Sequence, residues 1–228
     1  MIEGILLIDK EEGITSYDVI RKLKRVLPKG QKIGHAGTLD PFATGLLIIL
    51  LGKSTKLMNN FLELRKEYEV RVEFGYSTDT QDITGRKTNI SKDFKKISKE
   101  KIERMIGERF LGRILQLPPQ YSAKKVKGKK AYEYAREGEK VDLKPKEIEI
   151  YEFDIINYDW PVVDFNVMCS SGTYVRTLAN DLGLNLETFA TPIKLRRIRI
   201  GEFNVSDSLS SADIVKGVKF NFLQWEND

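Results

Sequence analysis

Alternation of apolar and polar residues in two separate segments is the feature that most limits the fold of this chain. The apolar members of the two series are Tyr68, Val70, Val72 and Phe74, and Val163, Phe165, Val167 and Cys169. A period of two residues is typical of strands with one buried face. The pattern therefore predicts half-buried strands that pair with antiparallel neighbours, and it disfavours a doubly wound parallel sheet.

Helix and strand signals are mixed without a regular strand–helix–strand order, which favours an α+β fold with a mixed, largely antiparallel central sheet flanked by helices. The expected strands cover 4–8, 46–51, 68–74, 113–117, 147–160, 162–169 and 194–203. The expected helices cover the segment after Thr15, 54–64, the segment after Ser98, 131–136, the segment after Thr173 and 208–215. Thr15 and Asp18 resemble a capping box, and 31–44 is expected to be a loop. Because no repeat or linker divides the sequence, we expect one domain over residues 1–228.

Basic residues are concentrated in one segment of a chain whose net charge is +5. Residues 113–146 contain ten Lys or Arg and four Asp or Glu, and Tyr121, Tyr132 and Tyr134 lie among them. Cations attract phosphates and aromatic rings stack on unpaired bases, so the combination suits single-stranded or looped RNA. A solvated basic loop is the alternative explanation. A second basic cluster lies at 194–199.

Scarce ligand residues exclude several classes of site. The single cysteine, Cys169, excludes an internal disulfide framework, and the single histidine, His35, excludes histidine-cluster zinc sites and Ser–His or Cys–His relays. Residues 52–54 resemble the end of a P-loop, but Leu47 stands where the first glycine is needed. Residues 79–85 lack the spacing of a calcium loop. We therefore expect no metal and no cofactor, and covalent chemistry would depend on a carboxylate.

Two loops are candidates for that chemistry. Residues 34–41 contain His35, two glycines and Asp40 immediately before a proline. Alone, this loop fits a simple turn. A carboxylate in such a loop is also a candidate nucleophile or general base if a cation keeps it ionised. Residues 170–176 join a strand to a helix N-terminus, where free N–H groups bind anions. Arg176 either points back toward that turn or lies on the surface.

Six motifs in the same order resemble the TruB family of tRNA pseudouridine-55 synthases. They are 4–10, 34–41, 66–68, 78–82, 118–123 with 128–130, and 171–176. The resemblance extends from about residue 4 to residue 203. It implies a pseudouridine synthase fold and an isomerase that acts in tRNA processing by RNA modification. Such an enzyme flips uridine 55 out of the TΨC loop, breaks its N-glycosidic bond, rotates the uracil and rejoins it through carbon without a cofactor.

The resemblance also implies roles for individual residues. Asp40 matches the essential Asp, which attacks the ribose, attacks the base or acts as a base at the ribose. Arg176 matches the Arg that keeps this Asp ionised, Tyr68 the Tyr that stacks on the flipped uracil, and His35 the His that inserts among the bases of the T-loop. The further matching positions are Tyr174 and Leu195 in the uracil pocket, Lys10 and Asp82 near the cleft, Lys124, Lys125, Lys127, Lys129 and Lys130 in a mobile thumb, and Arg196 and Arg197 beside it.

The expected protein is a stand-alone bacterial type of this family. Its partner is the T-arm of tRNA, without a membrane or an obligatory protein partner, and we expect a cytoplasmic monomer. The thumb is an insertion at 113–146 that folds over RNA, and 206–228 is too short for a C-terminal PUA domain. Two alternatives remain: an RNA-binding protein that assists tRNA folding, and the catalytic subunit of a guide-RNA particle. A glycosidase normally needs two carboxylates across the scissile bond, and Asp40 alone has a matched setting.

Overall fold

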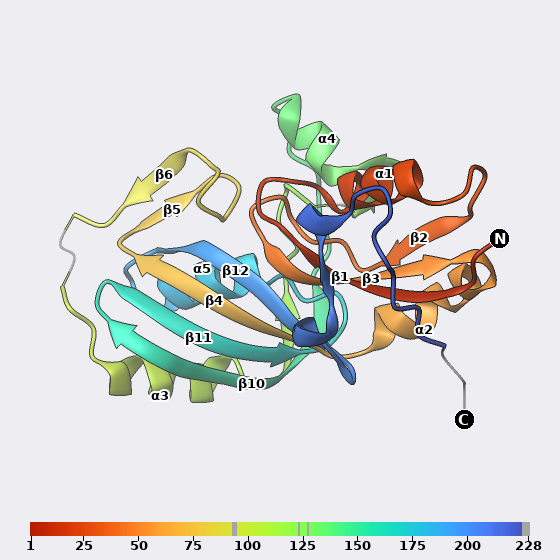
Figure 1. Cartoon of the computed structure of the whole chain (residues 1–228). Coiled ribbons are helices and arrows are strands. Elements are labelled where there is room, and N and C mark those ends of the chain that lie inside the picture. Colours follow the sequence, from red (N-terminus) through yellow and green to blue (C-terminus); the bar gives the residue numbers. More distant parts are fainter. Residues whose placement is uncertain (93–94, 123, 127, 225–228) are drawn as a thin grey trace. The chain divides into compact units, whose positions relative to one another are not determined.

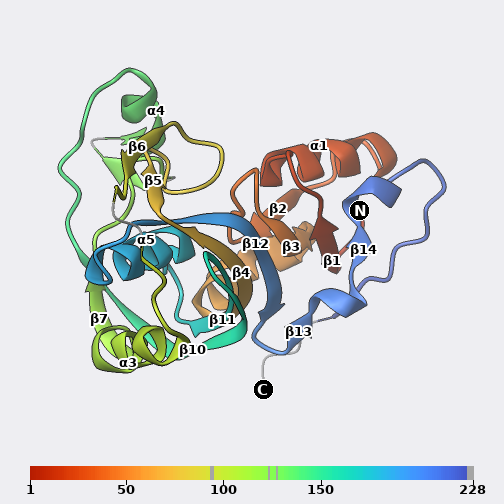
Figure 2. The ribbon, with the colours of Figure 1, turned by 90° about the vertical axis from the view of Figure 1, so that its left-hand side faces the viewer.

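Residues 1–92, 95–122, 124–126 and 128–224 are described by the structure, which is a computed structural model. They form two compact units (Figures 1 and 2). Unit 1 comprises Met1–Glu69 and Leu195–Asp228, and unit 2 comprises Val70–Lys194. The single catalytic domain that the sequence predicts, with its insertion at 113–146, stays a prediction.

Strands outnumber helices in the described part of the chain. The strands are β1 (Gly4–Lys10), β2 (Ile33–Ala36), β3 (Thr44–Leu51), β4 (Lys66–Phe74), β5 (Tyr76–Thr78), β6 (Lys87–Ile90), β7 (Gly112–Gln116), β8 (Lys125–Val126), β9 (Lys129–Lys130), β10 (Lys146–Asp159), β11 (Val162–Cys169), β12 (Ala190–Ile200), β13 (Phe203–Asn204) and β14 (Leu209–Ser210). The α-helices are α1 (Ser16–Val26), α2 (Met58–Glu63), α3 (Lys99–Arg109), α4 (Ala131–Arg136) and α5 (Val175–Asn185). The 3₁₀ turns are η1 (Gly52–Leu57), η2 (Val205–Asp207) and η3 (Ser211–Asp213).

The strand pairing confirms the α+β class with a mixed, largely antiparallel sheet. In unit 1 the order is β14-β1-β3-β12, with β2 on β3 and β13 on β12; in unit 2 the order is β4-β11-β10-β7. Strand pairs β1–β3, β2–β3, β12–β13, β10–β11 and β10–β7 are antiparallel. Strand pairs β1–β14 and β3–β12 are parallel. Among the described residues, no helix is both long and apolar enough to cross a membrane.

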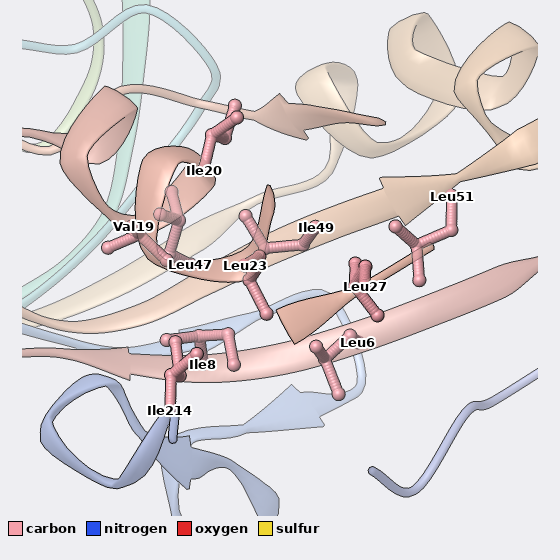
Figure 3. Packing of buried hydrophobic residues seen from close by; sticks show 10 residues of the cluster. All are labelled: Leu6, Ile8, Val19, Ile20, Leu23, Leu27, Leu47, Ile49, Leu51 and Ile214. Atoms are coloured by element: carbon pink, nitrogen blue, oxygen red, sulfur yellow. The ribbon is translucent and has the colours of Figure 1, made fainter. Parts of the chain in front are cut away.

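Both faces of the β1–β3 pair in unit 1 are covered. Successive side chains of a strand point to opposite faces, and Figure 3 shows Leu6 and Ile8 of β1 on the face that packs against α1. The residues of α1 on that face are Val19, Ile20 and Leu23. Ile5 and Leu7 belong to the opposite cluster, which contains Phe61 of α2. Coverage on both sides explains why β3 is one uninterrupted apolar run rather than an alternating one.

Helix α1 begins as its sequence predicts. The Thr15 hydroxyl accepts from the Asp18 N–H at 3.1 Å, and the Thr15 N–H donates to the Asp18 carboxylate at 2.9 Å. This reciprocal capping box satisfies two N–H groups that a helix start leaves free. The helix ends at Leu27, whose extended backbone leads into Pro28.

The core of unit 2 is aromatic. Phe153 of β10 meets Phe110 at the end of α3 and Phe165 of β11, with ring centroids 6.2 and 5.3 Å apart. Helix α3 starts at the Ser98 cap that the sequence predicts, where the hydroxyl accepts from the Lys101 N–H. The alternating patterns therefore predict the positions of β4 and β11 correctly, and β10 lies where the strand at 147–160 is expected. The Ser98 cap predicts the start of α3 correctly.

Three local predictions are wrong. The expected loop at 31–44 contains strand β2, because its backbone pairs with β3. Helix α5 starts after Tyr174 and has no side-chain cap, because the Thr173 hydroxyl donates to the Ser170 carbonyl at 3.0 Å instead. The expected helix at 208–215 is strand β14 followed by η3, because β14 pairs with β1.

The helix expected at 54–64 is an α-helix only in its second half. It starts as the 3₁₀ turn η1 and becomes α-helical at Met58. The short helix predicted at 131–136 is confirmed as α4.

Candidate active site

Asp40 lies in a tight turn of unit 1, within a segment that we call the Asp40 loop (residues 37–43). This loop connects β2 to β3. The Asp40 carbonyl accepts from the Ala43 N–H at 3.1 Å, and the Pro41 carbonyl accepts from the Gly13 N–H at 2.8 Å. Gly37 enters the loop at φ +92°, a conformation that side chains disfavour. The backbone on both sides of Asp40 is therefore held by hydrogen bonds.

Ser16, the first residue of α1, is bonded to the Asp40 loop. Its buried hydroxyl accepts from the Leu39 N–H at 2.9 Å and lies 3.3 Å from the Leu39 carbonyl oxygen, to which it can also donate. The peptide group that precedes Asp40 is thus fixed to the start of a capped helix. The sequence analysis missed Ser16, because nothing in its neighbours distinguishes it from an ordinary first-turn residue.

Lys10 is fully buried at the end of β1 and supports the same loop. Its ammonium group donates to the carbonyls of Glu11, Ile14 and Pro41 at 2.8, 2.9 and 3.3 Å. Burial lowers the pKa of Lys10 to about 8, and the negative charge of Asp40 opposes this shift. Lys10 therefore contacts the backbone next to Asp40, and its charge interacts with the Asp40 carboxylate.

Arg197 joins the two ends of the Asp40 loop from β12. Its guanidinium donates from Nε to the Leu46 carbonyl at 2.7 Å and from Nη2 to the Gly37 carbonyl at 3.0 Å. A Cβ on Gly45 would lie 2.2 Å from the Arg197 carbonyl oxygen, so this crossing of β3 and β12 requires glycine. Arg197 is 1% exposed and is therefore not the surface cation expected beside the thumb. Its neighbour Arg196 forms a two-bond ion pair with Asp9 at 3.0 and 2.7 Å.

The other expected residues of unit 1 are buried or half-buried. His35 lies on β2 opposite Ile49 of β3 and is half-buried. Tyr68 on β4 and Leu195 on β12 are 9% and 6% exposed. Tyr68 and Leu195 are therefore too buried to belong to a phosphate-binding surface.

Arg176 is the centre of a polar network inside unit 2. It is the second residue of α5 and is 3% exposed. Its Nη1 lies 3.3 Å from Oδ2 of Asp82 and also donates to the Thr80 carbonyl, and its Nη2 donates to the Tyr121 carbonyl at 3.0 Å. The other oxygen of Asp82 accepts from the Thr80 hydroxyl and from the Thr84 N–H, each at 2.9 Å. Asp82 is thus the carboxylate partner of a buried arginine, a role more specific than a position near the cleft.

Tyr174 is held by a residue that the sequence analysis missed. Its N–H donates to the side-chain amide of Gln116 at 2.8 Å, and the same amide donates to the Tyr174 carbonyl at 3.0 Å. Gln116 is 3% exposed at the end of β7. No sequence signal marks it, because its partner lies 58 residues away in the chain.

The basic segment interleaves cations and aromatic rings. Lys129 lies over Tyr134 at 4.6 Å and pairs with Glu137, and Lys130 lies over Tyr132 at 5.4 Å. Two further lysines of the set are exposed Lys125, the first residue of β8, and half-buried Lys124, which donates to the Lys144 carbonyl. Lys127 lies outside the described residues. The mixture of charges and rings has the chemistry that single-stranded RNA requires.

Metal-ligating side chains are dispersed in the part of the chain that the structure describes. No group of three or more His, Cys, Asp or Glu there is placed to hold a metal ion. The functional groups that do converge are a carboxylate in a fixed loop with a buried lysine beside it in unit 1, and a buried arginine–carboxylate pair in unit 2.

Comparison with known proteins identifies the family. Residues 24–175 match the TruB family pseudouridylate synthase (N terminal domain). The chain is 45% identical over 212 residues to the tRNA pseudouridine synthase B of Endomicrobium trichonymphae, covering 93% of this chain and 91% of that protein. It is 44% identical over 209 residues to the protein of that name from Clostridium kluyveri, covering 92% and 71%. The chain belongs to the TruB family of pseudouridylate synthases.

A solved structure supports the same assignment. A chain in the crystal structure of a Cbf5-Nop10-Gar1 complex superposes with a TM-score of 0.69 at 27% identity. The match covers 92% of this chain and 53% of that one, so this chain spans about half the length of its structural relative. The shared fold agrees with the pseudouridine synthase fold that the six sequence motifs imply.

Proposed function

We propose that this chain is a tRNA pseudouridine synthase that isomerises uridine 55 in the TΨC loop, with Asp40 as the catalytic carboxylate. The protein acts alone, as a monomer and without a cofactor, on the T-arm of tRNA. Relatives that are named tRNA pseudouridine synthase B match most of the chain's length, and this supports the reaction and the substrate class.

The observation that carries the proposal is the support of the Asp40 loop. The Ser16 hydroxyl accepts from the Leu39 N–H, and Lys10 and Arg197 donate to the carbonyls of Pro41 and Gly37, respectively. Three separate elements therefore fix the backbone that carries one carboxylate. A catalytic carboxylate needs such preorganisation, because misplacement by about 1 Å can reduce a rate about 100-fold. An ordinary surface turn has no need of buried cations for its support.

The proposed reaction conserves every atom of the nucleotide. The bond from ribose C1′ to uracil N1 breaks, the uracil rotates, and a bond from C1′ to C5 forms. The proton on C5 leaves and N1 gains a proton, so no redox partner or donor is needed. Asp40 attacks the ribose, attacks the base or removes a ribose proton, and each route uses its ionised form.

The remaining residues keep the roles that the family resemblance implies. Arg176 is proposed to keep Asp40 ionised, and Tyr68 to stack on the flipped uracil. His35 is proposed to enter the T-loop, with Tyr174 and Leu195 in the uracil pocket. Because a flipped base loses its stacking partners, an aromatic ring in the pocket replaces part of that contact. The lysines of the thumb are proposed to bind phosphates.

The test is pseudouridine formation in an unmodified tRNA transcript with purified protein and a chelator. We expect product at position 55 with the wild type and none with Asp40→Asn, which removes the charge and keeps the size. Asp9→Asn is the matched control, because Asp9 is paired with Arg196 outside the Asp40 loop. Equal activity of wild type and Asp40→Asn would refute the role of Asp40.

The same experiment separates the two alternative functions. For a protein whose main role is to assist tRNA folding, Asp40→Asn would lose isomerisation while binding and folding assistance persist. A catalytic subunit of a guide-RNA particle would form product only after a guide RNA and partner proteins are added. Product on bare transcript from the chain alone excludes a strict need for a guide RNA or for partner proteins.

A further inference from the structure

Helix α1 of unit 1 also carries a basic surface, in a part of the sequence outside the thumb. Residues 19–39 contain six Lys or Arg and no Asp or Glu. The exposed cations of α1 and the turn that follows it, which we call the α1 basic face, are Arg21, Lys24, Arg25, Lys29 and Lys32. The basic excess of the chain is predicted at 113–146 and not in this segment, because the charges of α1 are separated by the core residues of an amphipathic helix.

The charges lie on one side of α1 because of helical spacing. Arg21 follows Tyr17 by four residues, and Lys24 and Arg25 follow Arg21 by three and four, so they share the outward face. The opposite face packs into the core shown in Figure 3. These cations therefore project to solvent from a rigid element.

Several of these cations have no carboxylate to neutralise them. In unit 1, Arg21 pairs with Asp18 at 2.7 Å and Lys22 pairs with Glu11. By contrast, Lys24, Arg25 and Lys29 form no ion pair with any carboxylate in the described ranges. Uncompensated positive charge on one helix face attracts a polyanion.

An exposed aromatic ring lies among these charges. Tyr17 is 52% exposed, and Arg21 and Lys24 lie over its ring at 5.1 and 5.9 Å. A ring beside cations suits nucleic acid, in which phosphates alternate with stacked bases. The combination favours RNA over an acidic protein surface.

The α1 basic face is mechanically connected to the candidate catalytic loop. Ser16, at the start of the same helix, holds the Leu39 peptide group next to Asp40. Helix α1 also packs against β2, which carries His35. RNA bound along this face would therefore be held in a fixed position with respect to the Asp40 loop of unit 1.

We infer that the α1 basic face binds the phosphate backbone of the substrate RNA outside the loop that contains the target uridine. The choice of RNA as the occupant rests on the proposed function. The contacts are independent of sequence, because cations read phosphates rather than bases. The face thus sets the position of the RNA on unit 1 and adds affinity that the thumb does not provide.

The test is the salt dependence of tRNA binding, which does not require turnover. The variant Lys24→Gln/Arg25→Gln/Lys29→Gln removes three charges from the α1 basic face. We expect binding about 10-fold weaker or more at 0.1 M salt, and a plot of log affinity against log salt whose slope is smaller by about 2 to 3. A slope equal to that of the wild type would overturn the inference.

Helix α3 supplies a matched control. It has the same length as α1, but its basic residues alternate with Glu100, Glu103 and Glu108. The variant Lys101→Gln/Arg104→Gln/Arg109→Gln removes three charges there and should leave affinity and slope unchanged. An equal loss of affinity in both variants would mean that only net charge matters, and would refute a specific surface.

A charge-conserving variant protects the test against misfolding. Lys24→Arg/Arg25→Lys/Lys29→Arg keeps the charges and should keep the wild-type slope, and both α1 variants should unfold at the wild-type temperature. Retained RNA affinity of the glutamine variant, with lost binding to phosphatidylserine vesicles, would assign the face to a membrane surface and refute RNA. If the wild type binds tRNA with the expected slope but forms no pseudouridine, the proposed function fails while this inference stands.

Discussion

Buried cations have different partners in the two units. Lys10 and Arg197 of unit 1 and Arg176 of unit 2 are all at most 3% exposed. Lys10 and Arg197 donate to five backbone carbonyls between them. Arg176 has the carboxylate of Asp82 beside it, in addition to carbonyl partners.

Because their partners differ, the two sets of buried cations have different effects. A carbonyl satisfies an N–H donor but carries no formal charge, so the positive charges of Lys10 and Arg197 are not cancelled by the groups that they hold. The Asp82 carboxylate offsets part of the charge of Arg176 and holds its guanidinium in place. The cations of unit 1 therefore fix the Asp40 loop and also provide a positive field around it, whereas a carboxylate orients the buried cation of unit 2.

The largest loss of stability is expected from Arg197→Met. The substitution removes the Arg197 donors from the buried Leu46 carbonyl and the part-buried Gly37 carbonyl, so the free energy of unfolding should fall by about 3 kcal/mol. Arg196→Met, which breaks a partly exposed ion pair with Asp9, should cost about 1 kcal/mol or less. Urea unfolding measures both. Equal losses would show that the carbonyl contacts of Arg197 are not a special support.

The next effect is expected from Asp82→Asn in unit 2. The substitution keeps the size of the side chain and removes the charge that compensates Arg176, so we expect a loss of about 2 kcal/mol in the free energy of unfolding. The matched control is Asp164→Asn, whose partner Arg71 is 42% exposed and can be solvated. If Asp164→Asn loses as much stability as Asp82→Asn, the burial of the Arg176–Asp82 pair does not affect the free energy of unfolding.

The lowered pKa of Lys10 makes the stability of unit 1 depend on pH. Its pKa is lowered from 10.5 to about 8 in the folded protein, so between these values the unfolded chain binds more protons than the folded one. The free energy of unfolding should therefore gain a contribution from Lys10 that rises from pH 8 to pH 10.5, by at most about 1.4 kcal/mol per pH unit.

The measurement compares wild type with Lys10→Met by urea unfolding at pH 7.5, 8.5 and 9.5. The difference between the two proteins should change over this range, whereas Arg196→Met should shift stability equally at all three values, because arginine stays charged and Arg196 is not among the charges that shift the pKa of Lys10. Parallel pH profiles for wild type and Lys10→Met would contradict the lowered pKa.

The smallest effect concerns the caps of the two equally long helices. Thr15→Ala removes the hydroxyl that accepts from the Asp18 N–H and donates to the Asp18 carboxylate at the start of α1, and should cost about 1 kcal/mol. Ser98→Ala removes a longer capping bond, 3.3 Å, at the start of α3 and should cost less. Thermal unfolding of both variants ranks the caps, and a larger loss for Ser98→Ala would reverse the comparison.

Local patterns made much of the fold predictable. Thr15 and Asp18 predict the start of α1, because a cap depends on residues three apart in the chain. The alternation in β4 and β11 predicts strands with one buried face, because the side chains of a strand point alternately to its two sides. The Asp40 loop was recognisable from its residue types, and the roles of its residues came from the family resemblance.

Long-range contacts explain what the patterns missed. Lys10 lies between acidic residues and looks like a surface side chain, but the Pro41 carbonyl that it binds is 31 residues away. Arg197 appears in a basic cluster, but its partner Gly37 is 160 residues away. The cap predicted at Thr173 failed for the opposite reason, since a nearer carbonyl at Ser170 takes its hydroxyl. Sequence patterns indicate which residues are polar, but not which backbone groups tertiary structure brings to them.

The parallel pairing of β3 with β12 has a consequence for biosynthesis. Arg197 reaches the Leu46 carbonyl across a separation of 151 residues, and the Gly37 carbonyl across 160. Proteins are made from the N-terminus, and contacts of such separation form slowly and late. The ribosome therefore synthesises Asp40 long before the residue that joins the ends of its loop. We expect nascent chains, and truncated products that end before Arg197, to carry the carboxylate without the geometry that orients it.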